Sequence, residues 1–125
     1  MSSPTLYRSF AAAATIAAKS FVKFTANRNE VAQASAATDK LAGAADLAAL
    51  AAGDLVDVQL DGLGEVTCGA VAIAAGDPIT ADANGLAKTA VLVAGQTVHV
   101  AGFALVPAAP GDIFAFQVER SVIVG

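Results

Sequence analysis

The most regular pattern of hydrophobic and polar positions in this 125-residue sequence is an alternation with a period of two, found in residues 55–61 and 113–119. The apolar positions are Val56, Val58, Leu60, Phe114, Phe116 and Val118. Successive side chains of a β-strand point to opposite faces, so each segment is predicted to be a strand with one buried and one solvated face. The same pattern predicts that Gln59 and Gln117 lie on the outer faces. A one-residue slip would expose the apolar set, so both registers are expected to be well defined.

A hairpin turn is predicted between two shorter strand segments, Ile79–Ala81 and Leu86–Lys88. The connection contains Asn84 and Gly85. Glycine adopts a positive φ without steric cost, and asparagine tolerates it better than most residues. An Asn-Gly pair between such segments is the strongest short-range hairpin signal in the chain.

Three Gly-Asp steps each precede an apolar-rich run. Their residues are Gly53, Asp54, Gly76, Asp77, Gly111 and Asp112. Such acids are candidate ligands of a metal or substrate, but a short carboxylate also accepts backbone N–H bonds in a tight turn. Pro78 additionally favours an extended conformation of the preceding residue. We therefore interpret the three steps as structural turns.

Two segments of the chain, residues 16–62 and 73–120, show the same order of features. Ile16 corresponds to Ile73, Gly43 to Gly102 and Gly53 to Gly111, at shifts of 57, 59 and 58 residues. A nearly constant shift indicates an internal duplication. Chance similarity in a chain rich in alanine and glycine is the alternative.

The predicted organisation is one compact, mainly β, barrel-like domain over residues 16–125, with the two repeats as its halves. Residues 1–15 lie outside the repeats and are expected to form an N-terminal arm or a strand that pairs elsewhere. Residues 39–52 contain three leucines among many alanines and fit either a short helix or a strand followed by a loop. The matching segment of the second half favours the strand and loop.

Composition narrows the class of protein. Alanine brings little apolar area and there is no tryptophan, so the core is expected to be thin and helped by neighbouring subunits. The net charge of −4 and the scattered cations argue against direct binding of nucleic acid. Polar residues, glycines and a proline interrupt the longest uncharged span, residues 89–111, so strands are expected there and not a membrane span. The alanine-rich run 10–18 lacks the leucine-rich centre of a secretion signal.

No catalytic, cofactor-binding or metal-binding constellation is predicted. His99 is the single histidine and Cys68 the single cysteine, and no spacing marks either as activated. EF-hand, zinc and phosphate-loop spacings are absent from the sequence. Enzymatic activity and a bound cofactor are therefore not expected.

Residues 16–120 resemble the small capsid cement, or head decoration, proteins of tailed bacteriophages. The motifs that carry the resemblance are Gly76-Asp77-Pro78, Ala81-Asp82-Ala83-Asn84-Gly85, and the closing Ala-Gly and Gly-Asp pairs of the second half. The resemblance implies a structural virion protein on the outer surface of the capsid, made in the host cytoplasm. It implies that a homotrimer at threefold or local threefold positions reinforces contacts between major capsid subunits. The N-terminal segment matches the family least.

Two further expectations accompany this interpretation. Leu6, Tyr7 and Phe10 are candidate apolar anchors to the capsid if the N-terminal segment orders on a partner, and core positions if it is a first strand. The alternative function is a non-catalytic ligand-binding or accessory β-barrel domain, which would need a pocket with converging polar groups.

Overall fold

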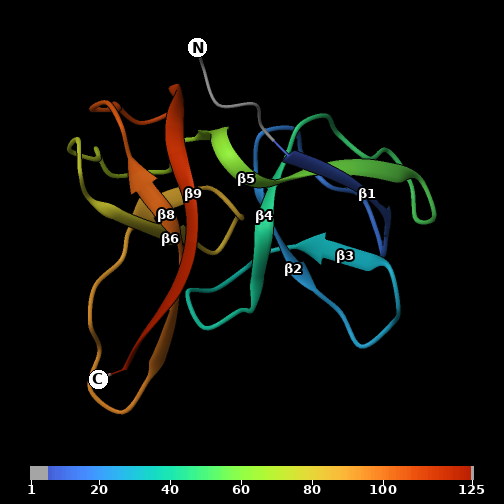
Figure 1. The fold of residues 1–125 in the computed structure, drawn as a ribbon, viewed down its shortest axis with the longest axis horizontal. Coiled ribbons are helices and arrows are strands. Elements are labelled where there is room, and N and C mark those ends of the chain that lie inside the picture. The colour runs from blue at the N-terminus through green and yellow to red at the C-terminus, as the bar shows by residue number, and fades with distance from the viewer. Residues whose placement is uncertain (1–5, 125) are drawn as a thin grey trace.

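The fold, seen in a computed structural model that describes residues 6–124, consists of nine β-strands, with no helix in that range (Figure 1). The strands are β1 (Leu6–Ala12), β2 (Phe21–Phe24), β3 (Glu30–Gln33), β4 (Leu41–Ala45), β5 (Leu55–Thr67), β6 (Pro78–Ala81), β7 (Ala87–Thr89), β8 (Thr97–Ala104) and β9 (Ile113–Val124). The predicted all-β class is confirmed. Residues 39–52 form β4 and a loop, as favoured over a helix.

Five strands form a closed barrel in the N-terminal half. Their order is β1-β3-β2-β4-β5, and β1 also pairs with β5, which closes the ring. β1 runs parallel to β3 and antiparallel to β5. The interior is filled by Phe10, Ile16, Val22, Val31, Val56 and Val58 together with small alanines. The predicted barrel-like architecture is therefore confirmed.

The C-terminal half repeats this pairing scheme. β6 pairs with β7 and β8, and β8 pairs with β9, all antiparallel, just as β2 pairs with β3 and β4, and β4 with β5. A parallel bridge between Cys68 and Ala87 joins the end of β5 to β7, at the place where β1 meets β3 in the first barrel. This recurrence is what an internal duplication predicts, although the duplication itself stays a hypothesis.

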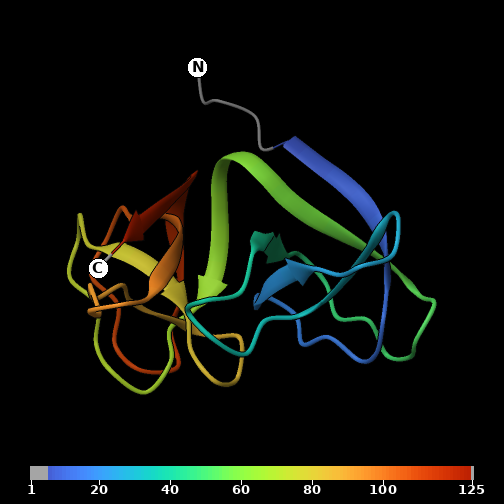
Figure 2. The same cartoon turned by 90° about the horizontal axis from the view of Figure 1, so that it is seen from below.

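β5 belongs to both halves. Residues 55–61 pair with β1 and β4, and residues 62–67 pair with β9. Figure 2 shows that the strand bends sharply between these two parts. Gly62 lies at the junction with a φ of 78°, a conformation that glycine adopts without strain. The two barrels therefore share one strand and have no linker between them.

The bend gives Gln59 a role that alternation does not predict. Its side chain is only 2% exposed, so its assignment to the outer face was wrong. Gln59 Oε1 accepts a hydrogen bond from Glu65 N at 2.7 Å, and Nε2 donates to Glu65 O at 3.3 Å. Because β5 folds back across its own outer face, the polar side chain is buried and satisfied inside the bend.

The wall formed by β4 and the first two residues of β2 is buried on both faces. Every residue of β4 is buried: Val22 and Ala42 pack in the first core, whereas Phe21, Leu41 and Ala44 pack in the second. A strand between two cores has no solvated face, and small side chains let both layers approach closely. This accounts for the composition Leu-Ala-Gly-Ala-Ala of β4. Phe21 also meets Phe116 edge-to-face, with ring centroids 5.6 Å apart.

Candidate functional site

The three Gly-Asp steps occupy turns of one design. In each, the aspartate N–H donates to the carbonyl oxygen three residues earlier, at 3.0–3.2 Å, and the glycine has a φ between 86° and 89°. Each carboxylate also accepts a hydrogen bond from the N–H of the first residue of its turn. The contacts are Ala51 N to Asp54 Oδ2 at 3.1 Å, Ala74 N to Asp77 Oδ2 at 3.1 Å, and Ala109 N to Asp112 Oδ2 at 3.0 Å. A positive φ at the third turn position requires glycine, and the carboxylate holds the turn from within.

The Asn84-Gly85 turn closes the β6–β7 hairpin and also contacts the first barrel. Asp82 Oδ1 accepts hydrogen bonds from Asn84 N at 2.8 Å and Leu86 N at 3.0 Å. Gly85 O accepts from Phe21 N, and Gln33 Nε2 donates to Asn84 O, both at 2.7 Å. A Cβ on Gly85 would approach Ala34 O to 2.9 Å. This hairpin therefore joins the two halves.

These acids do not converge. Across residues 6–124, no group of three or more histidine, cysteine, aspartate or glutamate side chains is arranged to hold a metal ion. Cys68 is buried in the second core and donates to Val71 O, and this burial raises the pKa of its thiol. Neither feature is that of an activated nucleophile, which needs a lowered pKa.

The N-terminal candidates are placed differently from one another. Phe10 is a core residue of the first barrel, only 4% exposed, so it is not available as a surface anchor. Tyr7 is exposed on β1. Leu6 begins β1, and its side chain lies outside the described part of the structure, as do residues 1–5 of the predicted N-terminal arm. Closing the barrel with β1 explains the burial of Phe10, since it pairs with Val56 of β5.

Lys19 forms the main charged cluster of the described residues, at the junction between the halves. Its Nζ lies 2.6 Å from Asp46 Oδ1 and 3.3 Å from Glu65 Oε1. The hydrogen bond to Asp46 raises the pKa of Lys19 above its ordinary value, against the opposing effect of burial. The backbone of Lys19 has a φ of 55° and its carbonyl accepts from Thr67 N. Lys19 therefore links the residue that directly follows β4 to the second part of β5.

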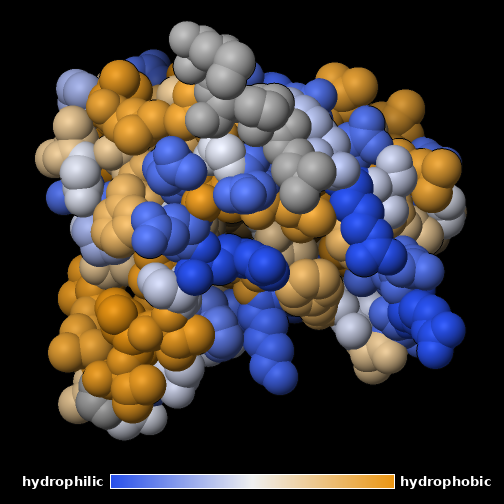
Figure 3. Space-filling model, in the orientation of Figure 1, coloured by the Kyte–Doolittle hydropathy of each residue, from blue (hydrophilic) through white to orange (hydrophobic). Residues whose placement is uncertain are grey.

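An exposed apolar surface lies at the far end of the second barrel. Figure 3 shows it as a continuous hydrophobic area at the lower left, where the β7–β8 connection and the end of β9 lie in Figure 1. We define this apolar lobe as Val91, Leu92, Val93, Val122 and Val124. Val124 is 70% exposed and Val91 66%. Contiguous exposed apolar area of this kind marks protein contact surfaces.

Sequence reasoning missed the apolar lobe. The three consecutive apolar residues 91–93 were interpreted as part of a strand, but they form a loop between β7 and β8. The available signal was their position just before the Ala94-Gly95 pair, since a glycine at that place is typical of a turn.

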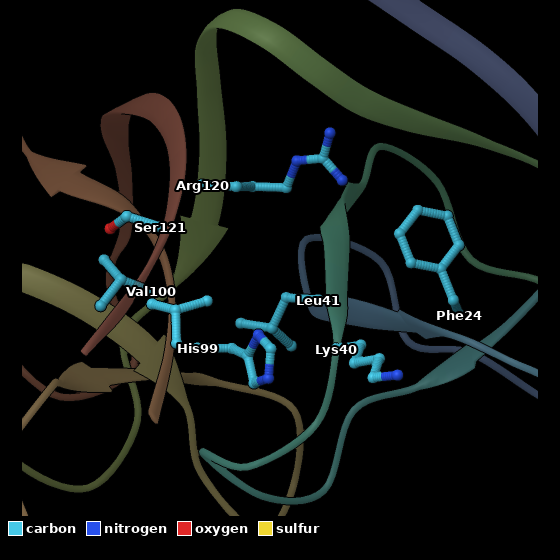
Figure 4. A pocket seen from close by; sticks show the side chains of 8 residues that line it. Phe24, Lys40, Leu41, His99, Val100, Arg120 and Ser121 are labelled. Atoms are coloured by element: carbon cyan, nitrogen blue, oxygen red, sulfur yellow. The ribbon is translucent and has the colours of Figure 1, made fainter. Parts of the chain in front are cut away.

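A groove separates the two barrels on the face shown in Figure 4. Its volume is about 300 Å³. One wall is formed by His99 and Val100 of β8 and by residues 120–122 of β9, and the other by Phe24, Lys40 and Leu41. The Arg120 side chain extends from β9 towards β4 and lies 6.0 Å from the Phe24 ring centroid (Figure 4). The groove is thus apolar at its base, with cationic groups at its margin.

Comparison with solved structures identifies a similar fold. The chain is similar to the structure described as the head fiber gp8.5 N base in bacteriophage phi29, with a TM-score of 0.68 and 18% sequence identity. The alignment covers 98% of this chain and 100% of that chain. At this level of identity, the likeness establishes a shared fold over the whole domain.

Sequence comparison adds no relative. No protein-family model matches the chain, and no curated protein sequence matches it. In residues 6–124 no helix is both long and apolar enough to span a bilayer. The class defined by these findings is an all-β domain of two barrel-like halves with the fold of a phage head fiber base.

Proposed function

We propose that the chain is a structural virion protein of a tailed bacteriophage that binds the outer surface of the head. The main support is the agreement in fold, over 98% of the chain, with a protein described as a head fiber base. The sequence resemblance to head decoration proteins supports the same kind of particle by a separate route. Fold alone does not determine function, so the surface has to supply the rest of the argument.

The apolar lobe is the surface that we assign to protein contact. Burying Leu92, Val122 and Val124 against another protein would remove exposed apolar area from water, which is favourable at about 25 cal/mol per Å². In this proposal three copies associate through the lobe into a homotrimer at a threefold or local threefold position. The trimer then contacts neighbouring major capsid subunits.

In this proposal, many copies of the chain on one capsid together reinforce the shell. Each copy adds contact area across a junction between major capsid subunits, and many copies act together on one closed shell. No catalytic step forms part of this proposal, because the turn aspartates are engaged with backbone N–H groups. Nucleic acid and membranes are not among the proposed partners.

Heads of the phage that carries this gene, prepared with and without the chain, test the proposal. Electron microscopy should show density for the chain over junctions between capsid subunits. Heads without it should release their DNA at a lower temperature. Equal thermal stability of the two preparations, or density located away from the head surface, would contradict the proposal.

Matched variants separate trimer formation from capsid binding. Leu92→Glu lies in the apolar lobe, whereas Leu50→Glu changes a leucine that is 80% exposed on the first barrel. Sedimentation velocity should show loss of the trimer for Leu92→Glu and not for Leu50→Glu. If the trimer persists in Leu92→Glu, the lobe is not its interface. Capsid binding is then tested separately, by co-sedimentation of the chain with heads.

A further inference from the structure

The last part of β9 is a strand with an open edge. Residues 113–118 of β9 lie between β5 and β8, whereas residues 121–124 pair with β8 alone among the described residues. The register with β8 shifts between Val100 and Gly102, opposite residues 119–120. We define residues 119–124 as the open edge. The unpaired N–H and C=O groups of such an edge are a template for another strand.

The groove is adjacent to this edge, since residues 120–122 form part of its wall. The opposite wall, from Phe24 and Leu41, stands across from β9. The groove has a volume of only about 300 Å³ and is bounded by Phe24 and Leu41 opposite β9, which leaves room for a short stretch of one extended chain but little room for the edge of a second sheet. The geometry therefore favours a peptide segment over direct sheet-to-sheet pairing with a second copy.

The charge of the groove also selects the occupant. Lys40 and Arg120 border it, and neither forms an ion pair with any of residues 6–124, although the chain carries a net charge of −4. Arg120 also lines a neighbouring hollow together with Asp61 and Glu119, whereas Lys40 does not. An acidic side chain beside Lys40 would complement the unpaired cations. Two copies facing each other through this edge would instead bring like charges together.

The molecule already contains one strand addition of this type. The second part of β5, residues 62–67, continues beyond the first barrel and is covered by β9 over residues 113–118. β9 itself continues beyond that pairing, and its own continuation has no such cover among the described residues. Residues 62–67 of β5, which pair with β9, are therefore the counterpart of the open edge in the same chain.

From these observations we propose that the open edge of β9 binds an extended segment of another polypeptide by strand addition, with an acidic side chain placed beside Lys40 and Arg120. Backbone hydrogen bonds to residues 121–124 supply affinity, and the groove selects apolar side chains on the alternate positions. This inference does not rest on the proposed role in a phage head, because it concerns the isolated chain.

Fluorescence anisotropy with synthetic peptides tests the proposal. The probe is an eight-residue peptide of alternating valine and threonine with two central glutamates, and the comparison peptide has lysines in place of the glutamates. The chain should bind the glutamate peptide at least ten-fold more tightly. Lys40→Glu combined with Arg120→Glu should reverse this preference, whereas Lys88→Glu, an exposed change on β7, should leave it unchanged.

Backbone methylation distinguishes strand addition from simple charge attraction. Two forms of the glutamate peptide carry N-methyl groups on alternate amides, in one register or the other. Strand addition predicts that one form loses binding and the other keeps it, because only one set of amides faces β9. Amide exchange should show new protection within residues 119–124.

Three outcomes would overturn the proposal. These are equal binding of both methylated forms, no binding of the glutamate peptide, and self-association of Leu92→Glu, which lacks the apolar contact of the lobe, with protection of residues 119–124 in the absence of peptide. Circular dichroism of each variant checks that the fold is retained. If the chain binds the glutamate peptide but does not bind phage heads, the proposed function is refuted and the strand-addition proposal stands.

Discussion

Single residues are most constrained where one backbone passes close to another. A Cβ built on Gly43 would lie 2.1 Å from Gln59 O, and one on Gly102 would lie 1.9 Å from Gln117 O. The two glycines occupy corresponding places in β4 and β8, next to a register shift in each pairing. Glycine in a strand interior commonly marks such a close approach.

Gly43→Ala and Gly102→Ala are each expected to lower the free energy of unfolding by about 3 kcal/mol, because the neighbouring backbone has to move. Gly95→Ala is the control: its φ of 77° is unfavourable for alanine, but no atom lies within 4 Å of the added Cβ. It should lose only about 1 kcal/mol. Urea denaturation measures all three, and equal losses would disprove the steric explanation.

Gln59 provides a second test at this scale. Replacing it with alanine leaves the partly buried Glu65 N–H without its acceptor, which costs about 1 kcal/mol or more. Gln96→Ala changes an exposed loop residue and should be nearly neutral. Urea denaturation should show the difference, and a neutral Gln59→Ala would mean that water replaces the lost hydrogen bond.

Gln59 also shows what residue patterns leave undetermined. Alternation correctly assigned Phe114, Phe116 and Val118 to the interior, because β9 keeps one face on one core over that range. It failed at Gln59, because the bend of β5 covers the outer face of the same strand. No local pattern records that residues 59 and 65 meet, since the contact depends on how the two barrels are arranged.

Elements were predicted best where turn chemistry marks their ends. The β6–β7 hairpin and the strands that follow Gly53 and Gly111 were anticipated, because glycine and aspartate requirements are local. The closure of the first barrel by β1 was only one of two alternatives. The apolar lobe was missed, because a short apolar run has the same sequence signature in a buried strand and an exposed loop.

Lys19 links elements and makes stability depend on pH. Its pKa is raised in the folded state, so its contribution is fully present below the unfolded pKa of about 10.4 and is lost as pH rises through the folded pKa. Lys19→Met should lower stability by about 0.5–1 kcal/mol at pH 8, a value limited by solvent screening.

The comparison of pH profiles isolates this effect. Between pH 8 and pH 11.5 the wild-type chain should lose more stability than Lys19→Met, because only the wild type loses the ion pair. Lys88→Met, an exposed change on β7, should follow the wild-type profile. Parallel profiles for the wild type and Lys19→Met would contradict a role for the cluster.

For the whole molecule, the distribution of the core predicts cooperative unfolding. One buried cluster contains Phe21, Leu41 and Ala44 from the first half together with Ile79, Phe114 and Phe116 from the second. The halves therefore cannot separate without exposing this cluster. A single unfolding transition is expected, as for most domains of this size.

Phe116→Ala tests this continuity. The side chain is fully buried against Phe21, so its truncation should cost about 3–5 kcal/mol. Amide exchange should show reduced protection in both barrels, including β2 and β4. Phe24→Ala, at a half-exposed position, should have a smaller effect. Loss of protection confined to residues 62–124 would show that the halves unfold independently.

The continuous β5 has a mechanical consequence. Two domains joined by a flexible linker can rotate relative to each other, so a force on one domain is partly absorbed by the linker before it reaches the other. Here one strand, bent at Gly62, runs through both halves, and a shared buried cluster that includes Phe21 and Phe116 packs them together. If one half is bound to a surface and the surface under the other half moves, the chain should resist as a rigid body. Strand pairs should then break before the two halves rotate relative to each other.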